Sequence, residues 1–203
     1  MARRQSPQLP VQQRAWDTRT RILSAAVECL VKDGYAATTV SRIQARSGVS
    51  RGSVNHQFPS MNELLVAAVQ HLAVVRTADM VAQGARAADD PDHAVVTLWA
   101  AMRGPLFTAT VELWIAARNS EDLRRELGPR EHELGHNIRS AVARIFGPSL
   151  SAAPRFPELV SLLLTSMRGV ALTYMFEPRD PAHDPHIVVW QNLARIYLVE
   201  SAS

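Results

Sequence analysis

The chain has 203 residues, of which 47% are hydrophobic and 20% are charged, with 9 Gly and 12 Pro. This composition is typical of one or two globular domains and excludes extended disorder and collagen-like repetition; Cys29 is the only cysteine, so a disulfide scaffold is excluded as well. The net charge of +3 is unevenly distributed: residues 1–62 carry nine basic and three acidic residues, a net +6, and the other 13 basic and 16 acidic residues give −3. A polyanion such as nucleic acid would therefore bind the first third of the chain. The alternative is a solvated basic surface that has no binding partner.

No segment for secretion or membrane insertion is predicted. Residues 1–14 include arginines, but no apolar stretch of the kind found in signal peptides follows them. A membrane-spanning helix needs about 20 largely apolar residues, and the most apolar window, residues 159–176, is interrupted by Ser161, Thr165, Ser166 and Arg168. We therefore expect a cytoplasmic protein without a membrane partner.

Hydrophobic residues recur at helical spacing in almost every segment, so the predicted fold class is all-α. A first helix is predicted to start at Asp17 as its N-cap and to end at Gly34, which suits a left-handed C-cap. Thr39 can cap a short helix that runs through residue 46 and is broken by Gly48. Ser50 can cap another short helix that reaches about residue 57.

The remaining two thirds of the chain are also predicted to be helical. Ser60 and Glu63 form a capping box at the start of a long helix that reaches about residue 86. Asp90 followed by Pro91 suits a cap and a first helical position. Gly, Pro and Asn-Ser signals divide the rest into helices at 92–103, 105–118, 121–146 with a break near 128, 157–177 and 185–200, which makes about nine helices in total.

The last two predicted helices carry wider hydrophobic stripes than the others. Stripes of this width require burial on two sides. The rest of the chain can cover one side, and a second copy is the simplest cover for the other, as a four-helix bundle with twofold symmetry. The sequence thus predicts a homodimer through the helices near 157–177 and 185–200.

Two short helices joined by a turn that contains Gly, in the basic part of the chain, form a helix-turn-helix pattern. The surrounding residues resemble the N-terminal domain of the tetracycline-repressor (TetR) family of transcriptional regulators over about residues 18–78. The resemblance is carried by Ile22-Leu23-Ser24-Ala25-Ala26, Gly34-Tyr35, Thr38-Thr39-Val40, Ile43, Gly48-Val49-Ser50, Gly52-Ser53 and Phe58-Pro59-Ser60. It implies a three-helix DNA-binding domain followed by an all-helical, dimeric, effector-binding domain. We accordingly expect a flexible basic arm (1–16), a helix-turn-helix domain (17–62) and a ligand-binding and dimerisation domain (63–203).

Candidate DNA-binding residues gather on the two short helices. Thr39 and Ser50 stand at helix N-termini, where hydroxyl and free backbone N–H groups can bind a phosphate. Arg51 can pair with guanine or phosphate, and Asn55 can pair with adenine, although an Asn on a helix surface is otherwise only solvated. The predicted DNA-binding set is Thr39, Arg42, Ser50, Arg51, Gly52, Ser53, Asn55 and His56. The predicted core of this domain is Val40, Ile43, Val49, Val54 and Phe58.

Four residues depart from the pattern of the family that the chain resembles. Asn55 stands where Tyr is most common and Met61 where Lys is frequent, and both usual residues contact phosphates. Gln44 and Ser47 stand where the family tends to have Ala. Weaker DNA binding, a changed operator or compensation by other residues would follow, and we hypothesise compensation by Arg42, Arg46, Arg51 and His56. The alternative is a ligand-binding or interaction module of the same fold that has weakened or lost DNA binding.

The effector-binding part carries no sharp motif. Large apolar residues at helical spacing can line a small-molecule pocket, although core packing is the simpler interpretation for each of them. The candidates are Trp99, Met102, Phe107, Trp114, Met167 and Tyr174. By the family resemblance, a bound small-molecule effector would change the separation of the two DNA-binding domains and release a palindromic double-stranded DNA operator. No cofactor is predicted, and the sequence names neither the effector nor the operator.

The segment His132-Glu133-Leu134-Gly135-His136 matches the H-E-x-x-H pattern of zinc hydrolases, in which two histidines bind the metal and the Glu activates water. On a helix, the two histidines would face away from the apolar stripe that contains Leu134 and Ile138. No third ligand follows before the proline breaks, so a solvated helix face is the preferred interpretation. The sequence therefore predicts a DNA-binding regulator rather than an enzyme, with zinc hydrolysis as the remote alternative.

Overall fold

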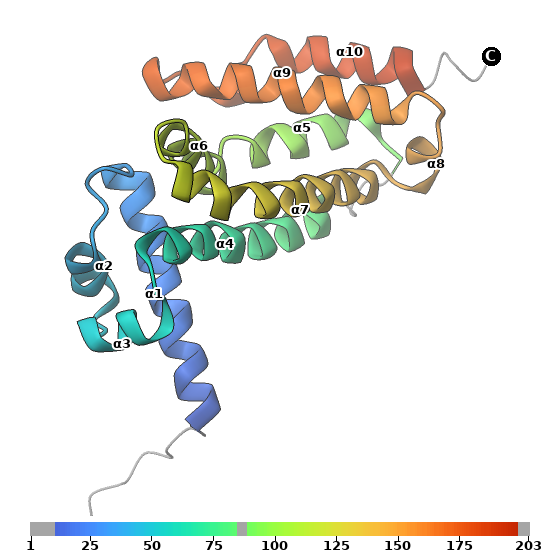
Figure 1. Cartoon of the computed structure of the whole chain (residues 1–203). Helices are drawn as coiled ribbons and strands as arrows, with labels where there is room; N and C mark the ends of the chain where they lie inside the picture. The colour runs from blue at the N-terminus through green and yellow to red at the C-terminus, as the bar shows by residue number, and fades with distance from the viewer. Residues whose placement is uncertain (1–10, 85–88, 199–203) are drawn as a thin grey trace, which may run out of the picture.

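The computed structural model describes residues 11–84 and 89–198, and these residues form helices and connecting turns without a strand (Figure 1). The N-terminal part holds α1 (Val11–Asp33), α2 (Val40–Ser47), α3 (Arg51–Gln57) and α4 (Met61–Gly84). The C-terminal part holds α5 (Pro91–Ala101), α6 (Pro105–Ala117), α7 (Glu121–Phe146), α8 (Pro148–Ser151), α9 (Phe156–Phe176), a 3₁₀ turn (Pro181–His183) and α10 (His186–Leu198). The predicted all-α class is confirmed.

The helices form two groups joined by α4 (Figure 1). At one end, α2 and α3 lie against α1, and at the other end α9 and α10 lie side by side over α5. The long helices α4 and α7 pack along each other between the two ends. One hydrophobic cluster joins α1–α4 to α6 and α7, and a second fills the C-terminal part, so α6 contributes Ala109 and Leu113 to the first and Phe107 and Val111 to the second.

The start of α1 differs from the prediction. The helix begins at Val11, so Asp17 lies inside it and is not its N-cap. Its end is as predicted: Gly34 has φ +77°, and its N–H donates to the Leu30 carbonyl oxygen over 3.2 Å. Residues 11–16, which were expected to belong to a flexible arm, are the first turns of this helix, whereas residues 1–10 lie outside the described part.

Two aspartates stabilise the segment at the start of α5. Asp90 caps α5 as predicted, since its Oδ1 accepts hydrogen bonds from the N–H groups of Asp92 and His93. The carboxylate of Asp89 accepts from the backbone N–H groups of Ser149 and Leu150 at the start of α8, a short helix that was not predicted. The predicted end of α4 near residue 86 falls outside the described residues.

The predicted break in α7 near residue 128 is wrong, because the helix runs through Gly128 and Pro129 to Phe146. A proline inside a helix removes one backbone hydrogen bond and costs about 3 kcal/mol. Leu127 and Leu134 are buried on either side of it, and this burial can offset a loss of that size. Packing therefore keeps the helix continuous where the local signal alone indicates a break.

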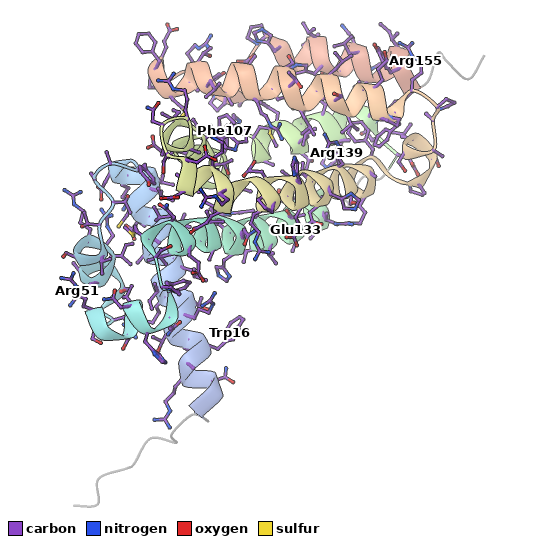
Figure 2. All side chains as sticks on the ribbon, in the orientation of Figure 1. Trp16, Arg51, Phe107, Glu133, Arg139 and Arg155 are labelled. Carbon is purple, nitrogen blue, oxygen red and sulfur yellow. The ribbon has the colours of Figure 1, made fainter. Side chains whose placement is uncertain are left out.

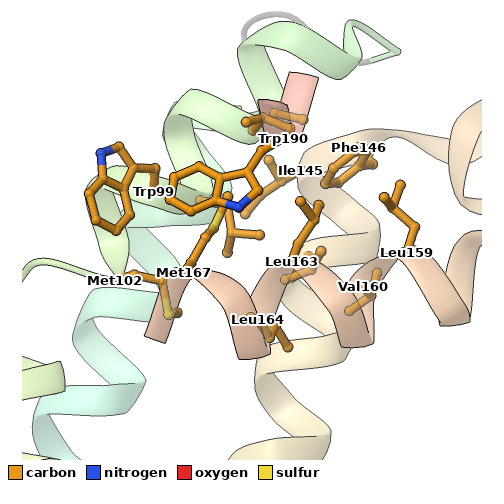
Figure 3. Close-up of a cluster of buried hydrophobic side chains, with 14 of the residues drawn as sticks. Trp99, Met102, Ile145, Phe146, Leu159, Val160, Leu163, Leu164, Met167 and Trp190 are labelled. Atoms are coloured by element: carbon orange, nitrogen blue, oxygen red, sulfur yellow. The ribbon is translucent and has the colours of Figure 1, made fainter. Parts of the chain in front are cut away.

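Two tryptophans form the centre of the C-terminal core (Figure 3). The rings of Trp99 and Trp190 lie 5.0 Å apart, and both side chains are about 1% exposed. Each indole N–H has a partner: Trp99 donates to the Pro181 carbonyl oxygen (2.9 Å) and Trp190 to the Ser166 hydroxyl (3.0 Å). The first bond ties α5 to the turn before α10, and the second ties α10 to α9.

Two helices of the described part, α4 and α9, are long and apolar enough to cross a membrane by length and composition. The bent pair α5 and α6 would count as a third if treated as one span. In α4, Leu64, Leu65 and Val69 are buried within the protein, whereas Val74 and Val75 are exposed. The expected absence of a membrane partner stays a prediction.

Candidate nucleic-acid interface

The inner sides of α2 and α3 are held by buried apolar residues. Ile43, Val49, Val54 and Phe58 are each 7% exposed or less, and Val40 packs against the same cluster while partly exposed. The predicted core of this domain is therefore confirmed. This packing presses both short helices against α1 and α4, so their outer sides are presented to solvent on a rigid support (Figure 1).

The two short helices are capped as their sequence predicts. The Thr39 hydroxyl accepts a hydrogen bond from Arg42 N (3.3 Å), and the Ser50 hydroxyl accepts one from Ser53 N (3.2 Å). Gly48, with φ +64°, ends α2, and a side chain there would meet the guanidinium of Arg21 at 3.0 Å. The Ser50 and Ser53 hydroxyls are also 3.0 Å apart, so part of the predicted phosphate-binding hydroxyl set is engaged within α3 itself.

The outer side of α3 presents Arg51, Gly52, Asn55 and His56 to solvent. The side chain of Arg51 forms no ion pair or hydrogen bond with any residue of the described chain, and it projects away from the body of the protein (Figure 2). Free guanidinium and amide groups on one helix face are the chemistry that reads base edges and phosphates. The predicted DNA-binding residues of α3 thus share one surface, on which Ser53 is half-buried.

The two arginines of α2 have a carboxylate partner within the protein, which the compensation hypothesis did not include. Asp33, at the end of α1, pairs with Arg42 (3.0 Å) and with Arg46 (2.7 Å). These hydrogen bonds, that of Arg46 first, lower the pKa of Asp33 to about 2. Arg46 also donates to the Cys29 sulfur, and these partners raise its pKa. Both arginines are therefore partly neutralised within the protein, and of the hypothesised compensating residues Arg51 and His56 present exposed side chains that no such pair engages.

Contacts that sequence reasoning missed fix the turn between α2 and α3 to α1. Arg21 of α1 donates to the Ser47 carbonyl oxygen, and the Ser47 hydroxyl accepts from Val49 N (3.2 Å). Ser47, which stands where the TetR family tends to have Ala, therefore has a hydrogen-bond partner within the turn. Arg19 stacks over the Phe58 ring at 4.5 Å. These arginines contribute to the basic charge of the N-terminal part, but their spacing on α1 gave no signal for these partners.

The predicted effector residues separate into two sets. Met102, Phe107 and Trp114 line one cavity of about 280 Å³ between α5, α6, α7 and α9. Trp99 and Met167 are buried in the core, and Tyr174 donates a hydrogen bond to the buried Asp184 carboxylate. The cavity also contains Glu131, Arg139 and Arg168, three charged residues that the search for apolar stripes could not find.

The H-E-x-x-H segment lies on α7, where His132, Glu133 and His136 are exposed. No group of three or more His, Cys, Asp or Glu side chains in the described part of the chain is arranged to hold a metal ion. The Glu133 carboxylate is 3.5 Å from the Arg130 guanidinium. The absence of a zinc site stays a prediction, which metal analysis after chelation and dialysis would refute by finding one retained zinc per chain.

A trihelical unit with two capped short helices, a left-handed glycine turn and an exposed basic face on the second short helix defines a helix-turn-helix DNA-binding protein. Residues 22–68 match the family profile "Bacterial regulatory proteins, tetR family". The N-terminal part of the chain therefore carries a DNA-binding domain of the TetR family, as its residues indicate, and the chain functions as a DNA-binding transcriptional regulator.

Relatives and solved structures extend the similarity to most of the chain. The helix-turn-helix-type regulator Rv2912c of Mycobacterium tuberculosis is 26% identical over 179 residues, which cover 87% of this chain and 92% of the relative. The nicotine-responsive transcriptional repressor HdnoR of Paenarthrobacter nicotinovorans is 25% identical over 192 residues, 90% of this chain and 94% of the relative. The crystal structure of a transcriptional regulator from Rhodococcus sp. RHA1 has the same fold, with a TM-score of 0.67, 18% identity, and coverage of 89% and 95% of the two chains.

Proposed function

We propose that this regulator is a homodimeric repressor that binds a palindromic operator through α2 and α3 and leaves it when a small-molecule effector binds among the C-terminal helices. The observation that carries this proposal is the exposed face of α3, on which Arg51, Asn55 and His56 project from a helix whose inner side is buried. Similarity over most of its length to HdnoR, a repressor named as nicotine-responsive, supports control by an effector. We further propose that residues 17–62 bind DNA, that residues 63–203 bind the effector and the second subunit, and that the protein acts in the cytoplasm without catalysis.

The outer face of α9 and α10 supports the homodimer. From residue 161 to residue 176, none of the exposed residues of α9 is charged. Leu162 and Leu172 on α9, and Val188 and Val189 on α10, are 44–60% exposed, and these two helices lie side by side at the end of the molecule far from α3 (Figure 1). Beside them, a side chain at Gly169 would meet no atom within 4 Å. Exposed apolar faces of this kind mark interaction sites, and two copies would form the predicted four-helix bundle.

Helix α6 connects the effector cavity to the DNA-binding domain. Phe107, Thr110 and Trp114 line the cavity, while Glu112 on the same helix accepts a hydrogen bond from the backbone N–H of Tyr35 over 2.7 Å. The Tyr35 hydroxyl in turn donates to Asn62 at the start of α4 (3.1 Å). A ligand that displaces α6 would therefore act directly on the turn that follows α1, which is a physical link between the two sites.

The first experiment is selection from a random pool of duplex DNA with the purified protein, followed by a salt titration of the best sequence. The proposal expects enrichment of a palindrome, with the logarithm of affinity falling linearly with the logarithm of salt concentration. A protein carrying Arg51→Ala serves as the matched control, because this exposed side chain has no structural partner in the described chain. Enrichment of non-palindromic sites, or equal enrichment by the control, would contradict the proposal.

A second candidate, a ligand-binding module with weakened DNA binding, is favoured by one observation. Asp33 pairs with both arginines of α2, so fewer free cations face the DNA than the sequence suggests. This candidate predicts no enrichment and only weak, salt-sensitive binding to any duplex. An Asp33→Asn variant distinguishes this candidate from the repressor. If the paired arginines are what weakens DNA binding, freeing both of them raises the affinity for duplex DNA and steepens its salt dependence.

A further inference from the structure

The cavity between α5, α6, α7 and α9 is apolar on one side and charged on the other. Its volume of about 280 Å³ lies just below the range of about 300–1,000 Å³ that is usual for small-molecule sites. Met102, Phe107, Ile138 and Leu164 form its apolar wall. A second cavity of about 170 Å³ shares Met102 and Ile138 with it, so an apolar chain has space to extend past the flexible Met102 side chain.

The charged side of the cavity carries two guanidinium groups and one carboxylate. Arg168 is half-buried and Arg139 is more exposed, and neither forms an ion pair with a carboxylate in the described chain. The pKa of Arg168 is lowered by burial, an effect that Glu131 opposes and Arg139 reinforces. Burial likewise raises the pKa of the Glu131 carboxyl, against a hydrogen bond from Trp114 and the charges of Arg168 and His132. Arg139 and Arg168 thus lie close enough to repel each other, and Glu131 is the one carboxylate in the lining of this cavity.

We propose that this cavity binds an organic monocarboxylate, with its carboxylate held by Arg139 and Arg168 and its apolar body against Phe107, Met102 and Leu164. Two guanidinium groups and one carboxylate leave the lining with one net positive charge when His132 is neutral, which one carboxylate group would neutralise. Arginine binds carboxylates through two parallel hydrogen bonds, which are stronger where water is partly excluded. This inference rests on the proposed function, because it names the chemical class of its effector.

The test uses isothermal titration calorimetry with compounds of similar shape and different charge: 4-phenylbutyrate, 4-phenylbutan-1-ol and 4-phenylbutylamine, together with hexanoate and octanoate. We expect at least one carboxylate to bind, and the alcohol and the amine to bind more than tenfold more weakly than 4-phenylbutyrate. Tighter binding of the amine, or failure of all three carboxylates to bind, would overturn the proposal.

Variants of the charged cavity residues test which of them attract the carboxylate and which repel it. Arg168→Gln should weaken carboxylate binding about tenfold to a hundredfold, because a charge-assisted hydrogen bond is lost. Glu131→Gln should strengthen it several-fold, because a like charge is removed. The matched control is Arg125→Gln on α7, whose side chain is 70% exposed and pairs with Asp122 outside the cavity; it should change nothing. Circular dichroism checks that each variant is folded, and unchanged binding by both folded cavity variants would refute the assignment.

Release of DNA is measured separately, by adding the same carboxylates to the protein bound to its selected operator. Carboxylate binding with the expected variant pattern but without DNA release would support this cavity assignment and contradict the proposed effector control. Release by an amine or a neutral compound, with no carboxylate bound, would leave the proposed function standing and overturn the present inference.

Discussion

Replacing Glu112 by Ala removes the hydrogen bond that joins α6 to the turn after α1. The Glu112 Oε2 atom is 2.7 Å from Tyr35 N, and it lies 3.2 Å from where a side chain at Gly34 would begin. A hydrogen bond to a charged group contributes about 1.5–3 kcal/mol to stability. Glu112 is half-buried, so water can replace part of this bond, and we expect a loss of about 1–2 kcal/mol.

For a chain of this length, each kcal/mol corresponds to about 2–4 °C in the melting temperature, so Glu112→Ala should melt about 2–8 °C lower than the wild type. Glu112→Gln keeps a neutral acceptor and should lose about half as much. The control is Glu133→Ala, which removes an exposed ion pair to Arg130 and should lower the melting temperature by less than about 2 °C. Thermal unfolding followed by circular dichroism measures all three variants. If Glu112→Ala has the same melting temperature as the wild type, this hydrogen bond does not hold α6 and the turn after α1 together.

Three further predictions concern the interface, the dimer and pH. Arg51→Ala should weaken specific operator binding by about 1–3 kcal/mol in a competition assay, and an equal loss in Arg125→Ala would show that only general charge is involved. Leu172→Glu should yield a monomer by light scattering, whereas Val74→Glu, at a residue that is 71% exposed on α4, should remain a dimer; a dimeric Leu172→Glu would exclude the α9–α10 interface. The pKa of Asp33 is lowered to about 2 by its hydrogen bonds to the α2 arginines, so its stabilising effect is complete above about pH 4 and is lost as the pH falls towards 2. The stability difference between wild type and Asp33→Asn, measured by urea unfolding, should therefore shrink over this interval, and a difference that stays constant to pH 2 would contradict the ion pairs.

The N-terminal domain was predictable because its signals are local. Thr39, Gly48 and Ser50 act on backbone groups within three or four residues of themselves, so their spacing contains the information that places α2 and α3. Asp17 failed as a cap because residues 11–16 continue the helix before it. A capping residue indicates where a helix can begin, but the preceding segment decides whether it does.

The partners of charged residues were not predictable, because they depend on packing. Arg46 meets Asp33 and Cys29 only when α2 crosses α1, and this crossing leaves no mark in the local spacing. The same limit applies to the proposed effector cavity: Trp99 and Phe107 are both large apolar residues at helical spacing, yet one is a core residue and the other also lines the cavity. Whether Pro129 breaks α7 or is tolerated inside it likewise depends on the burial of the neighbouring residues.

Helix α6 divides its residues between two tasks along separate faces. Phe107, Thr110 and Trp114 face the cavity, whereas Ala109 and Leu113 pack into the core shared with the N-terminal helices. Substitutions on the first face can alter which ligand is accepted while the second face keeps the DNA-binding domain in place. Under the proposed effector control, new ligand specificity can therefore arise by changes on one side of a single helix, and a designer has a defined set of positions to vary and a defined set to leave unchanged.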